Sequence, residues 1–399
     1  MTKHTRAPRL HFFSSNSIKL AITSLISITL ACSLSTPAQA ADSVKLASIV
    51  ELTGSGATAG TNFKNGVNLA IKEINAAGGI MGKKIETTVM DTQSNPGIAK
   101  GLTKKAIDDD VFAVFGPVFS GSIIVSMAET RRAEIPNFTG GEAADITMQG
   151  NPYIFRTSFT QSIAIPKVAN YIRRIALIKN LAIIYVNNDF GKGGNDVMLK
   201  SLDPSKTKIV ADISTDPGQI DFSAAILKAK QSNADGIFVY VNEEESARIL
   251  RELKKQGWNK PIVGETTLTG QKVIDLAGDA ANGVRAHVGL TVDAPNPAIR
   301  AFKAKFEKEY KYTSDHNGMK GYSGVYILKA AIEKVGKFDR KAVAAALHGI
   351  KISTAAQPGV LMDVEIDNKG DLNRASFMVE VKNGKQEVIL ELPMIPTQH

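Results

Sequence analysis

The segment SIVELTGSGATAGTNFKNGVNLAIKEINAAGG, residues 48–79, joins an apolar run to a glycine-rich loop and then to a helical pattern. Apolar residues such as Phe63, Val67 and Ile74 recur at helical spacing, and the Gly78-Gly79 pair ends the pattern. The segment therefore predicts a strand, a ligand-binding loop and a helix. Such a loop is typical both of enzymes that bind a dinucleotide and of binding proteins that bind a different ligand.

The glycine spacing argues against a dinucleotide. The dinucleotide fingerprint places glycines at positions one, three and six, with an acidic residue about 20 positions further on. Here Gly54, Gly56 and Gly60 fall at positions one, three and seven, and Asp91 lies 31 residues beyond Gly60. We expect no nucleotide cofactor.

Catalytic and metal-binding patterns are also missing from the sequence. His287 and His316 stand apart from any nucleophile pattern, no G-x-S-x-G motif occurs, and no His or Cys residues have metal-ligand spacing. The sequence therefore predicts a protein that is not an enzyme and that needs no metal or other cofactor.

The N-terminal 40 residues have the composition of a cleaved secretory signal. They contain basic residues but no acidic ones, then the apolar stretch LAITSLISITLACSL, and end in Ala38-Gln39-Ala40. We expect cleavage after Ala40 and a periplasmic location. An alternative is a lipid anchor on Cys32, but Thr29 stands where a lipoprotein signal usually has leucine.

Cleavage would change the charge and the cysteine content of the chain. The full chain has a net charge of +9, and loss of four basic residues leaves 44 basic against 39 acidic residues. The remaining basic residues are scattered along helical patterns, so we expect no nucleic-acid partner. Cys32 is the single cysteine, so the mature protein would have no disulfide.

Strand and helix patterns alternate along the 399 residues, a length that favours two domains. The strands are near-continuous apolar runs, typical of parallel sheets with helices on both faces. The sequence thus predicts an α/β protein with two doubly wound lobes and a small antiparallel tail. Strands are expected at 44–50, 84–91, 111–116, 135–139, 153–158, 181–186, 208–214, 236–241, 261–265 and 285–290.

Small, polar or glycine-rich residues follow the predicted strands. Ligands of open parallel sheets bind at the carboxyl ends of the strands, and helix N-termini there attract carboxylates. A cleft between two such lobes is the predicted ligand site. The rim segments are 53–60, 91–95, 116–122, 139–145, 187–194, 242–245 and 264–269.

Several motifs, taken in order over nearly the whole mature chain, resemble the periplasmic binding proteins of ABC importers, of the branched-chain amino acid-binding type. They are LTGSGATAGTNFKNGVNLAIKEINAAGGIMGKKIE, VFGPVFSGS, EIPNFTGGEAADIT, YIFRTSFTQS, AIIYVNNDFGKG, DFSAAILKAKQSNADGIFVYV, ILRELKKQGW and LAGDAANGV.

The resemblance implies a type I periplasmic binding fold, in which three crossovers join two lobes that close over a small ligand. We place the crossovers near Ser158, Gly289 and Gln357. One lobe would then contain residues 41–158 and 289–356, and the other 159–288 and 357–399. The implied partners are an inner-membrane permease and its ATPase subunits, and the expected state is a monomer.

The resemblance also assigns ligand contacts in the first lobe. Ser120 in GPVFSGS matches the serine that holds the ligand carboxylate, and N-capping of the next helix is an alternative role. Gly141 matches the carbonyl that accepts from the ligand ammonium, and Ala143 stands where threonine is expected. Glu142 departs from the family pattern, either as a contact to a second positive group or as a surface residue at a helix start.

In the second lobe, Phe190 in NNDFGKG matches an aromatic residue that packs on the ligand. Asn242 stands where tyrosine is common. Glu265 matches the acid that binds the ligand ammonium, unless Thr266 takes that position. Tyr322, in KGYSGVY, is a candidate aromatic residue of the cleft or hinge.

The resemblance implies capture of a small solute, most simply an amino acid, by lobe closure and its delivery to an ABC permease. Two alternatives stay open. In the first, the chain is a sensory receptor component with the same fold. In the second, it binds an aromatic or other carboxylate instead of an amino acid.

Overall fold

The computed structural model of the chain describes residues 43–394. The predicted signal sequence, with Cys32 and the cleavage position after Ala40, lies outside these residues. Within the described part, no helix is long and apolar enough to span a membrane.

The first lobe is built on a parallel sheet of five strands. The strands are β1 (Val44–Val50), β2 (Ile85–Asp91), β3 (Ala113–Phe115), β4 (Asn137–Thr139) and β5 (Ile154–Arg156). Their spatial order is β2-β1-β3-β4-β5. Six of the seven residues of β1 are buried, which explains its continuous apolar run.

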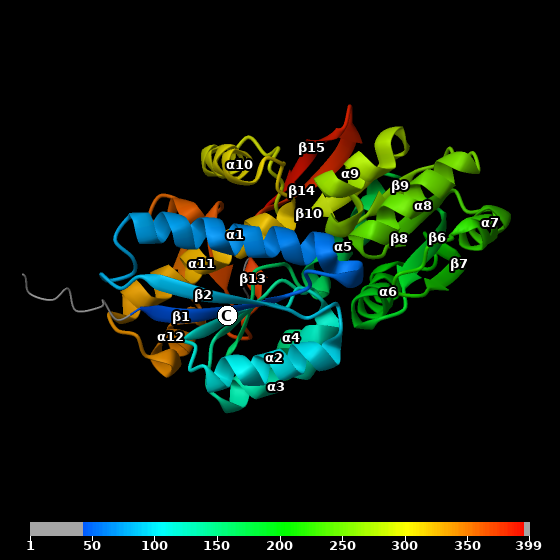
Figure 1. Cartoon of the computed structure of the whole chain (residues 1–399). Helices are drawn as coiled ribbons and strands as arrows, with labels where there is room; N and C mark the ends of the chain where they lie inside the picture. Colours follow the sequence, from blue (N-terminus) through cyan, green and yellow to red (C-terminus); the bar gives the residue numbers. More distant parts are fainter. Residues whose placement is uncertain (1–42, 395–399) are drawn as a thin grey trace, which may run out of the picture. The chain divides into compact units, whose positions relative to one another are not determined.

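Seven helices belong to the first lobe in the described chain. They are α1 (Ala57–Ala76), α2 (Pro96–Asp108), α3 (Ser120–Arg132), α4 (Asp145–Met148), α10 (Pro297–Tyr310), α11 (His316–Val335) and α12 (Arg340–Leu347). Helices α1 and α11 pack against each other on one face of the sheet, and α2 and α3 on the opposite face (Figure 1). Helices therefore cover both faces of the sheet, as its buried apolar strands require.

Glycine permits the close approach of α1 to α11. A Cβ atom added to Gly66 would lie 1.9 Å from the carbonyl oxygen of Gly318, and one on Gly321 would lie 2.2 Å from that of Phe63. The two backbones are therefore in direct contact, and this contact fixes the start of α11 against the middle of α1.

The second lobe is built on a seven-stranded mixed sheet. Its parallel strands are β6 (Asn180–Val186), β7 (Lys208–Thr215), β8 (Gly236–Tyr240), β9 (Ile262–Gly264) and β10 (Arg285–Val288). The antiparallel strands β14 (Ser376–Lys382) and β15 (Lys385–Leu392) extend it beyond β10. A turn at Asn383-Gly384, where both residues have positive φ, joins the last two strands and confirms the predicted hairpin.

The helices of the second lobe are α5 (Gln161–Arg174), α6 (Asp189–Ser201), α7 (Ser223–Gln231), α8 (Glu243–Lys255) and α9 (Gln271–Ala277). Helices α5 and α6 contact each other, and α8 contacts both α7 and α9. The predicted α/β fold with two doubly wound lobes and three crossovers is confirmed. Short 3₁₀ turns η1 (Gly54–Gly56), η2 (Thr266–Leu268), η3 (Gly278–Ala281) and η4 (Pro358–Val360) complete the loops.

The last crossover lies later in the chain than Gln357. The strands β11 (Lys351–Ile352), β12 (Val364–Ile366) and β13 (Leu372–Asn373) form a separate antiparallel sheet. Side chains from Val360 to Leu372 pack into the core of the first lobe, and the chain enters the second sheet only at Ser376. We infer that the third crossover is at residues 374–375.

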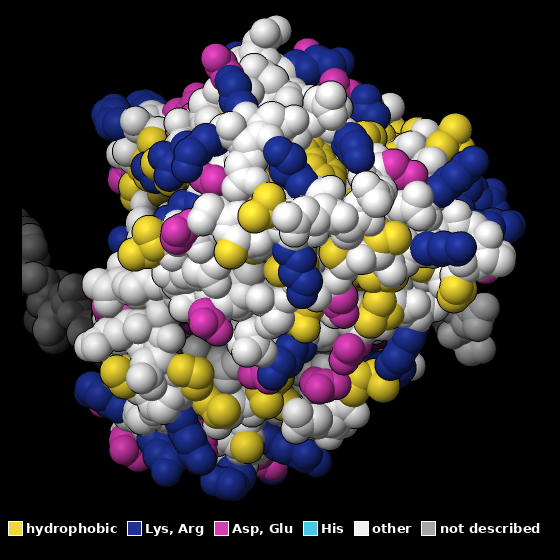
Figure 2. All heavy atoms as spheres, turned by 90° about the vertical axis from the view of Figure 1, so that its right-hand side faces the viewer, with side chains coloured by type: hydrophobic (Ala, Val, Ile, Leu, Met, Phe, Trp, Pro, Cys, Tyr) yellow, Lys and Arg dark blue, Asp and Glu magenta, His cyan; other side chains and the backbone are white. Residues whose placement is uncertain are grey.

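Charged side chains are dispersed over the surface in view. Figure 2 shows lysine and arginine interspersed with acidic and apolar side chains on the face that carries the outer helices of the second lobe. This distribution agrees with the expectation of scattered basic residues.

Candidate functional site

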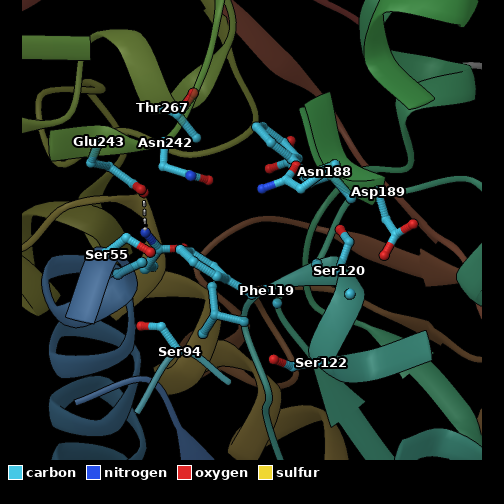
Figure 3. A pocket seen from close by; sticks show the side chains of 18 of the residues that line it. Ser55, Ser94, Phe119, Ser120, Ser122, Asn188, Asp189, Asn242, Glu243 and Thr267 are labelled. Atoms are coloured by element: carbon cyan, nitrogen blue, oxygen red, sulfur yellow. Dashed lines mark hydrogen bonds between the residues drawn. The ribbon is translucent and has the colours of Figure 1, made fainter. Parts of the chain in front are cut away.

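A cavity of about 270 Å³ lies between the lobes, at the carboxyl ends of their parallel strands. Side chains from both walls point into the space between them (Figure 3). The polar lining residues are Ser55, Ser94, Ser120, Ser122, Glu142, Asn188, Asp189, Asn242, Glu243, Thr267, His316, Asn317 and Lys320. Apolar surface comes from Ala59, Pro96, Val118, Phe119, Phe190 and Pro217, so the cavity suits a small solute with polar and apolar parts.

Ser120 opens α3 and borders the cavity. It is buried, and its hydroxyl oxygen accepts a hydrogen bond from the N–H of Ala143 at 3.2 Å. The first-turn N–H groups of α3 have no carbonyl partner within the helix, so they favour an anion at this end of the cavity. Asp189 of α6 approaches the same turn from the second lobe, beside Gly121.

Glu51 holds the loop that leads into α3. Its fully buried carboxylate accepts hydrogen bonds from the backbone N–H groups of Val118 at 3.0 Å and Phe119 at 3.1 Å. Burial raises the pKa of Glu51, and these hydrogen bonds oppose that change. No local sequence pattern reveals this positioning residue, because its partners lie 67 and 68 residues away.

The carbonyl of Gly141 is already occupied. It accepts hydrogen bonds from Nη1 of Arg156 at 2.8 Å and from the hydroxyl of Ser158 at 2.7 Å. A carbonyl oxygen has two lone pairs, and both directions are used. Arg156 is fully buried and also pairs with Asp371 at 2.5 Å. The sequence-based role of Gly141 as an ammonium acceptor therefore conflicts with these contacts, although Gly141 does border the cavity.

Ala143 does not border the cavity. Its side chain packs with Ile123 and Ile146, and its carbonyl accepts from Nη2 of Arg156 at 2.6 Å. The residue lies beneath the rim, which explains why an apolar side chain is accommodated here.

Glu142 forms a buried ion pair with Lys320. The Nζ atom of Lys320 lies 3.0 Å from Oε1 of Glu142, and both side chains are almost completely buried. Burial and, to a smaller extent, the nearby Glu265 carboxylate raise the pKa of Glu142 to about 7, while Lys320 opposes the increase. Glu142 is thus a buried member of the cavity wall and not a surface residue. Sequence analysis did not identify Lys320.

Tyr322 points away from the cavity. Its hydroxyl donates to Glu73 at 2.7 Å, and its ring packs against Phe302 in the first-lobe core. Residues two positions apart on a helix point about 200° apart. Because Lys320 faces the cavity, Tyr322 must face the opposite side, so its predicted place in the cleft is corrected.

Glu265 lies behind the cavity wall. Its carboxylate accepts from the N–H of Thr266 at 2.5 Å and from the hydroxyl of Thr266 at 2.6 Å. Nδ1 of His287 lies 3.0 Å from it, and burial lowers the pKa of His287 to about 3, so this imidazole is neutral. Neither Glu265 nor Thr266 lines the cavity; Thr267 does, and its buried hydroxyl has no partner within the described residues.

Phe190 and Asn242 line the second-lobe wall of the cavity, and their contact with the ligand stays a prediction. The ring of Phe190 stacks on Tyr240 with 4.2 Å between centroids. Asn242 forms a capping box with Glu245 at the start of α8 and contributes to the cavity as well.

Two acidic residues of α8 reach across to the first lobe. The amide of Asn317 donates to Glu243 at 3.0 Å, and the N–H of Thr58 donates to Glu244 at 3.2 Å. Burial, followed by the charges of Glu244 and Asp315, raises the pKa of Glu243 to about 8. Glu243 is therefore mostly protonated at neutral pH. The acidic run does more than start a helix, because it joins the two lobes.

Metal coordination has no support in the described part of the chain, where no group of three or more His, Cys, Asp or Glu side chains has a metal-binding arrangement. The polar side chains of the cavity carry hydroxyl, amide, imidazole, carboxyl and ammonium groups.

Comparisons with known proteins extend this description. The family model described as periplasmic binding protein matches residues 43–386. The chain is 30% identical over 359 residues to the Leu/Ile/Val-binding protein BraC3 of Rhizobium johnstonii, covering 88% of this chain and 95% of that protein.

Two solved structures are similar throughout. One is the branched-chain amino acid transporter substrate-binding protein LivJ of Streptococcus pneumoniae with isoleucine: TM-score 0.80, 26% identity, covering 88% of this chain and 99% of that one. The other is an ABC-transporter solute-binding protein of Rhodopseudomonas palustris with 3,4-dihydroxybenzoic acid: TM-score 0.81, 23% identity, covering 89% and 97%. At this identity the latter supports the fold alone.

Proposed function

Because the chain belongs to the periplasmic binding protein family, we propose that it captures a small carboxylate-bearing solute between its lobes and delivers it to an ABC-type permease with its ATPase subunits. Isoleucine, the solute bound to the similar protein of Streptococcus pneumoniae, has a carboxylate. We carry that chemistry to this protein.

The observation that carries this proposal is the position of Ser120. Its hydroxyl and the first-turn N–H groups of α3 meet at the cavity, as carboxylate recognition requires. Phe119 and Phe190 supply apolar surface for the rest of the solute.

Capture works by closure. Ligand contacts from both walls, together with the hydrogen bonds of Asn317 to Glu243 and of Thr58 to Glu244, favour the closed form. The permease would distinguish that form from the open one. The solute leaves chemically unchanged, the protein is exported to the periplasm, and it acts as a monomer.

The test is thermal stability of the purified protein with a panel of amino acids, aliphatic acids and aromatic acids. A ligand at 100 times its Kd stabilises the folded state by about 2.7 kcal/mol. We expect a shift with at least one carboxylate, lost in Ser120→Ala and retained in Ser205→Ala, an exposed control in the second lobe. A folded protein that responds to no carboxylate contradicts the proposal, and so does recovery of a chemically altered ligand.

A further inference from the structure

We propose that the solute carries a carboxylate but no ammonium beside it, because Lys320 places the protein's own ammonium group in that part of the cavity. This inference rests on the proposed function and specifies the class of solute. It excludes α-amino acids and favours simple aliphatic or aromatic acids.

Lys320 is held where a ligand ammonium would be expected. It extends from α11 and is 4% exposed. Its Nζ lies 3.0 Å from Oε1 of Glu142 and 3.4 Å from the carbonyl oxygen of Gly140. Glu142 and the Gly140 carbonyl are the acceptors that would otherwise be open to a ligand ammonium. Lys320 borders the same cavity as Ser120.

The remaining acceptors offer no replacement site. The Gly141 carbonyl accepts from Arg156 and Ser158. Glu265 accepts from Thr266 and does not border the cavity. An added ammonium would therefore lie beside that of Lys320 with few acceptors, and both like-charge repulsion and unpaired donors would weaken binding.

Two other acids, Glu243 and Asp189, border the cavity. Glu243 accepts from Asn317 at 3.0 Å, and its raised pKa leaves it mostly uncharged at neutral pH. Asp189 lies beside Gly121 in the first turn of α3, which is the carboxylate end of the cavity. Neither replaces the acceptors that Lys320 uses.

Lys320 also has one donor left for the solute. An ammonium has three N–H bonds. Two point to Glu142 and Gly140, and no other acceptor for Nζ is found within residues 43–394. A carboxylate or hydroxyl oxygen of the solute would complete this set, whereas an ammonium group, which has no lone pair, would not.

Matched pairs that differ only by the α-amino group test the inference. We would titrate the purified protein at pH 7 with 4-methylpentanoate and leucine, and with 3-phenylpropionate and phenylalanine. We expect the acid without the amino group to bind more tightly, on the order of 100-fold, in at least one pair. Equal or tighter binding of the amino acid overturns the inference and leaves the proposed function standing. If none of the four binds and the wider panel also fails, the proposed function itself falls, and the inference with it.

Substitution of Lys320 identifies the cause of the preference. In Lys320→Met, Glu142 loses its ammonium partner and becomes available to a ligand ammonium. The ratio of the dissociation constants of the amino acid and the matched acid should therefore fall at least tenfold. This change corresponds to about 1.4 kcal/mol of differential binding. Lys329→Met removes a lysine paired with Glu333 on the same helix, outside the cavity, and should keep the preference. The double variant Lys320→Met/Glu142→Gln leaves no unpaired charge and controls for folding. An unchanged preference in both the single and double variants contradicts the inference.

Discussion

The side-chain amide of Asn317 donates a hydrogen bond to Oε1 of Glu243 across 3.0 Å, and thereby links α11 of the first lobe to α8 of the second. Both residues are buried and border the cavity. The contact therefore exists only when the lobes are close together, and it contributes to the free energy of closure.

Removal of this contact should weaken ligand binding. A hydrogen bond of this kind contributes about 1 kcal/mol, so Asn317→Ala should raise Kd about fivefold. Glu243→Gln keeps the acceptor and should bind nearly as well as the original protein. Calorimetric titration measures both constants, and Asn282→Ala, at an exposed position, is the control. A Kd in Asn317→Ala equal to that of the control would remove the contact from the closure mechanism.

Stability should fall as pH rises from about 6.5 to 8. Burial raises the pKa of Glu142 to about 7 and that of Glu243 to about 8 from 4.5, so the folded state binds more protons than the unfolded state in this window. The stabilisation is full below the unfolded pKa and is lost as pH passes through the folded values. Melting temperatures at constant ionic strength test this, and Glu243→Gln should reduce the slope. A melting temperature that rises between about pH 6.5 and 8 would contradict the raised pKa values of Glu142 and Glu243.

Gly66→Ala should strongly destabilise the first lobe. The added methyl group would lie 1.9 Å from the backbone oxygen of Gly318, which cannot rotate away. We expect a loss of about 3 kcal/mol in the free energy of unfolding, at the upper end of overpacking effects. Gly101→Ala on α2 is the matched control, because its methyl group meets nothing within 4 Å and should stabilise by about 0.5 kcal/mol. Urea denaturation compares the two, and similar stabilities would argue against close packing of α1 on α11.

Local patterns explain why much of the fold was predictable from sequence. Buried parallel strands leave apolar runs, and the helices between them leave periodic patterns, so strands such as β1 and β8 were evident. Ser120, Phe190 and Asn242 follow strands directly, and strand ends in such sheets meet at one edge. Their positions at the cavity were therefore predictable.

The charged network behind the cavity was not predictable in the same way. Arg156 and Asp371 are 215 residues apart, and Lys320 and Glu142 are 178 apart, so no local pattern links the partners. The start of α11 is buried on all sides, from His316 to Val325, and thus has no polar stripe to reveal which side faces the ligand. No local pattern therefore distinguishes Lys320, which borders the cavity, from Tyr322, which does not.

The most direct test of carboxylate capture is a crystal structure of the protein with the carboxylate that stabilises it most. We expect a solute between the lobes, with its carboxylate within hydrogen-bond distance of the Ser120 hydroxyl and the first-turn N–H groups of α3. A solute bound outside this cavity, or one whose carboxylate lies away from α3, would contradict the proposed function.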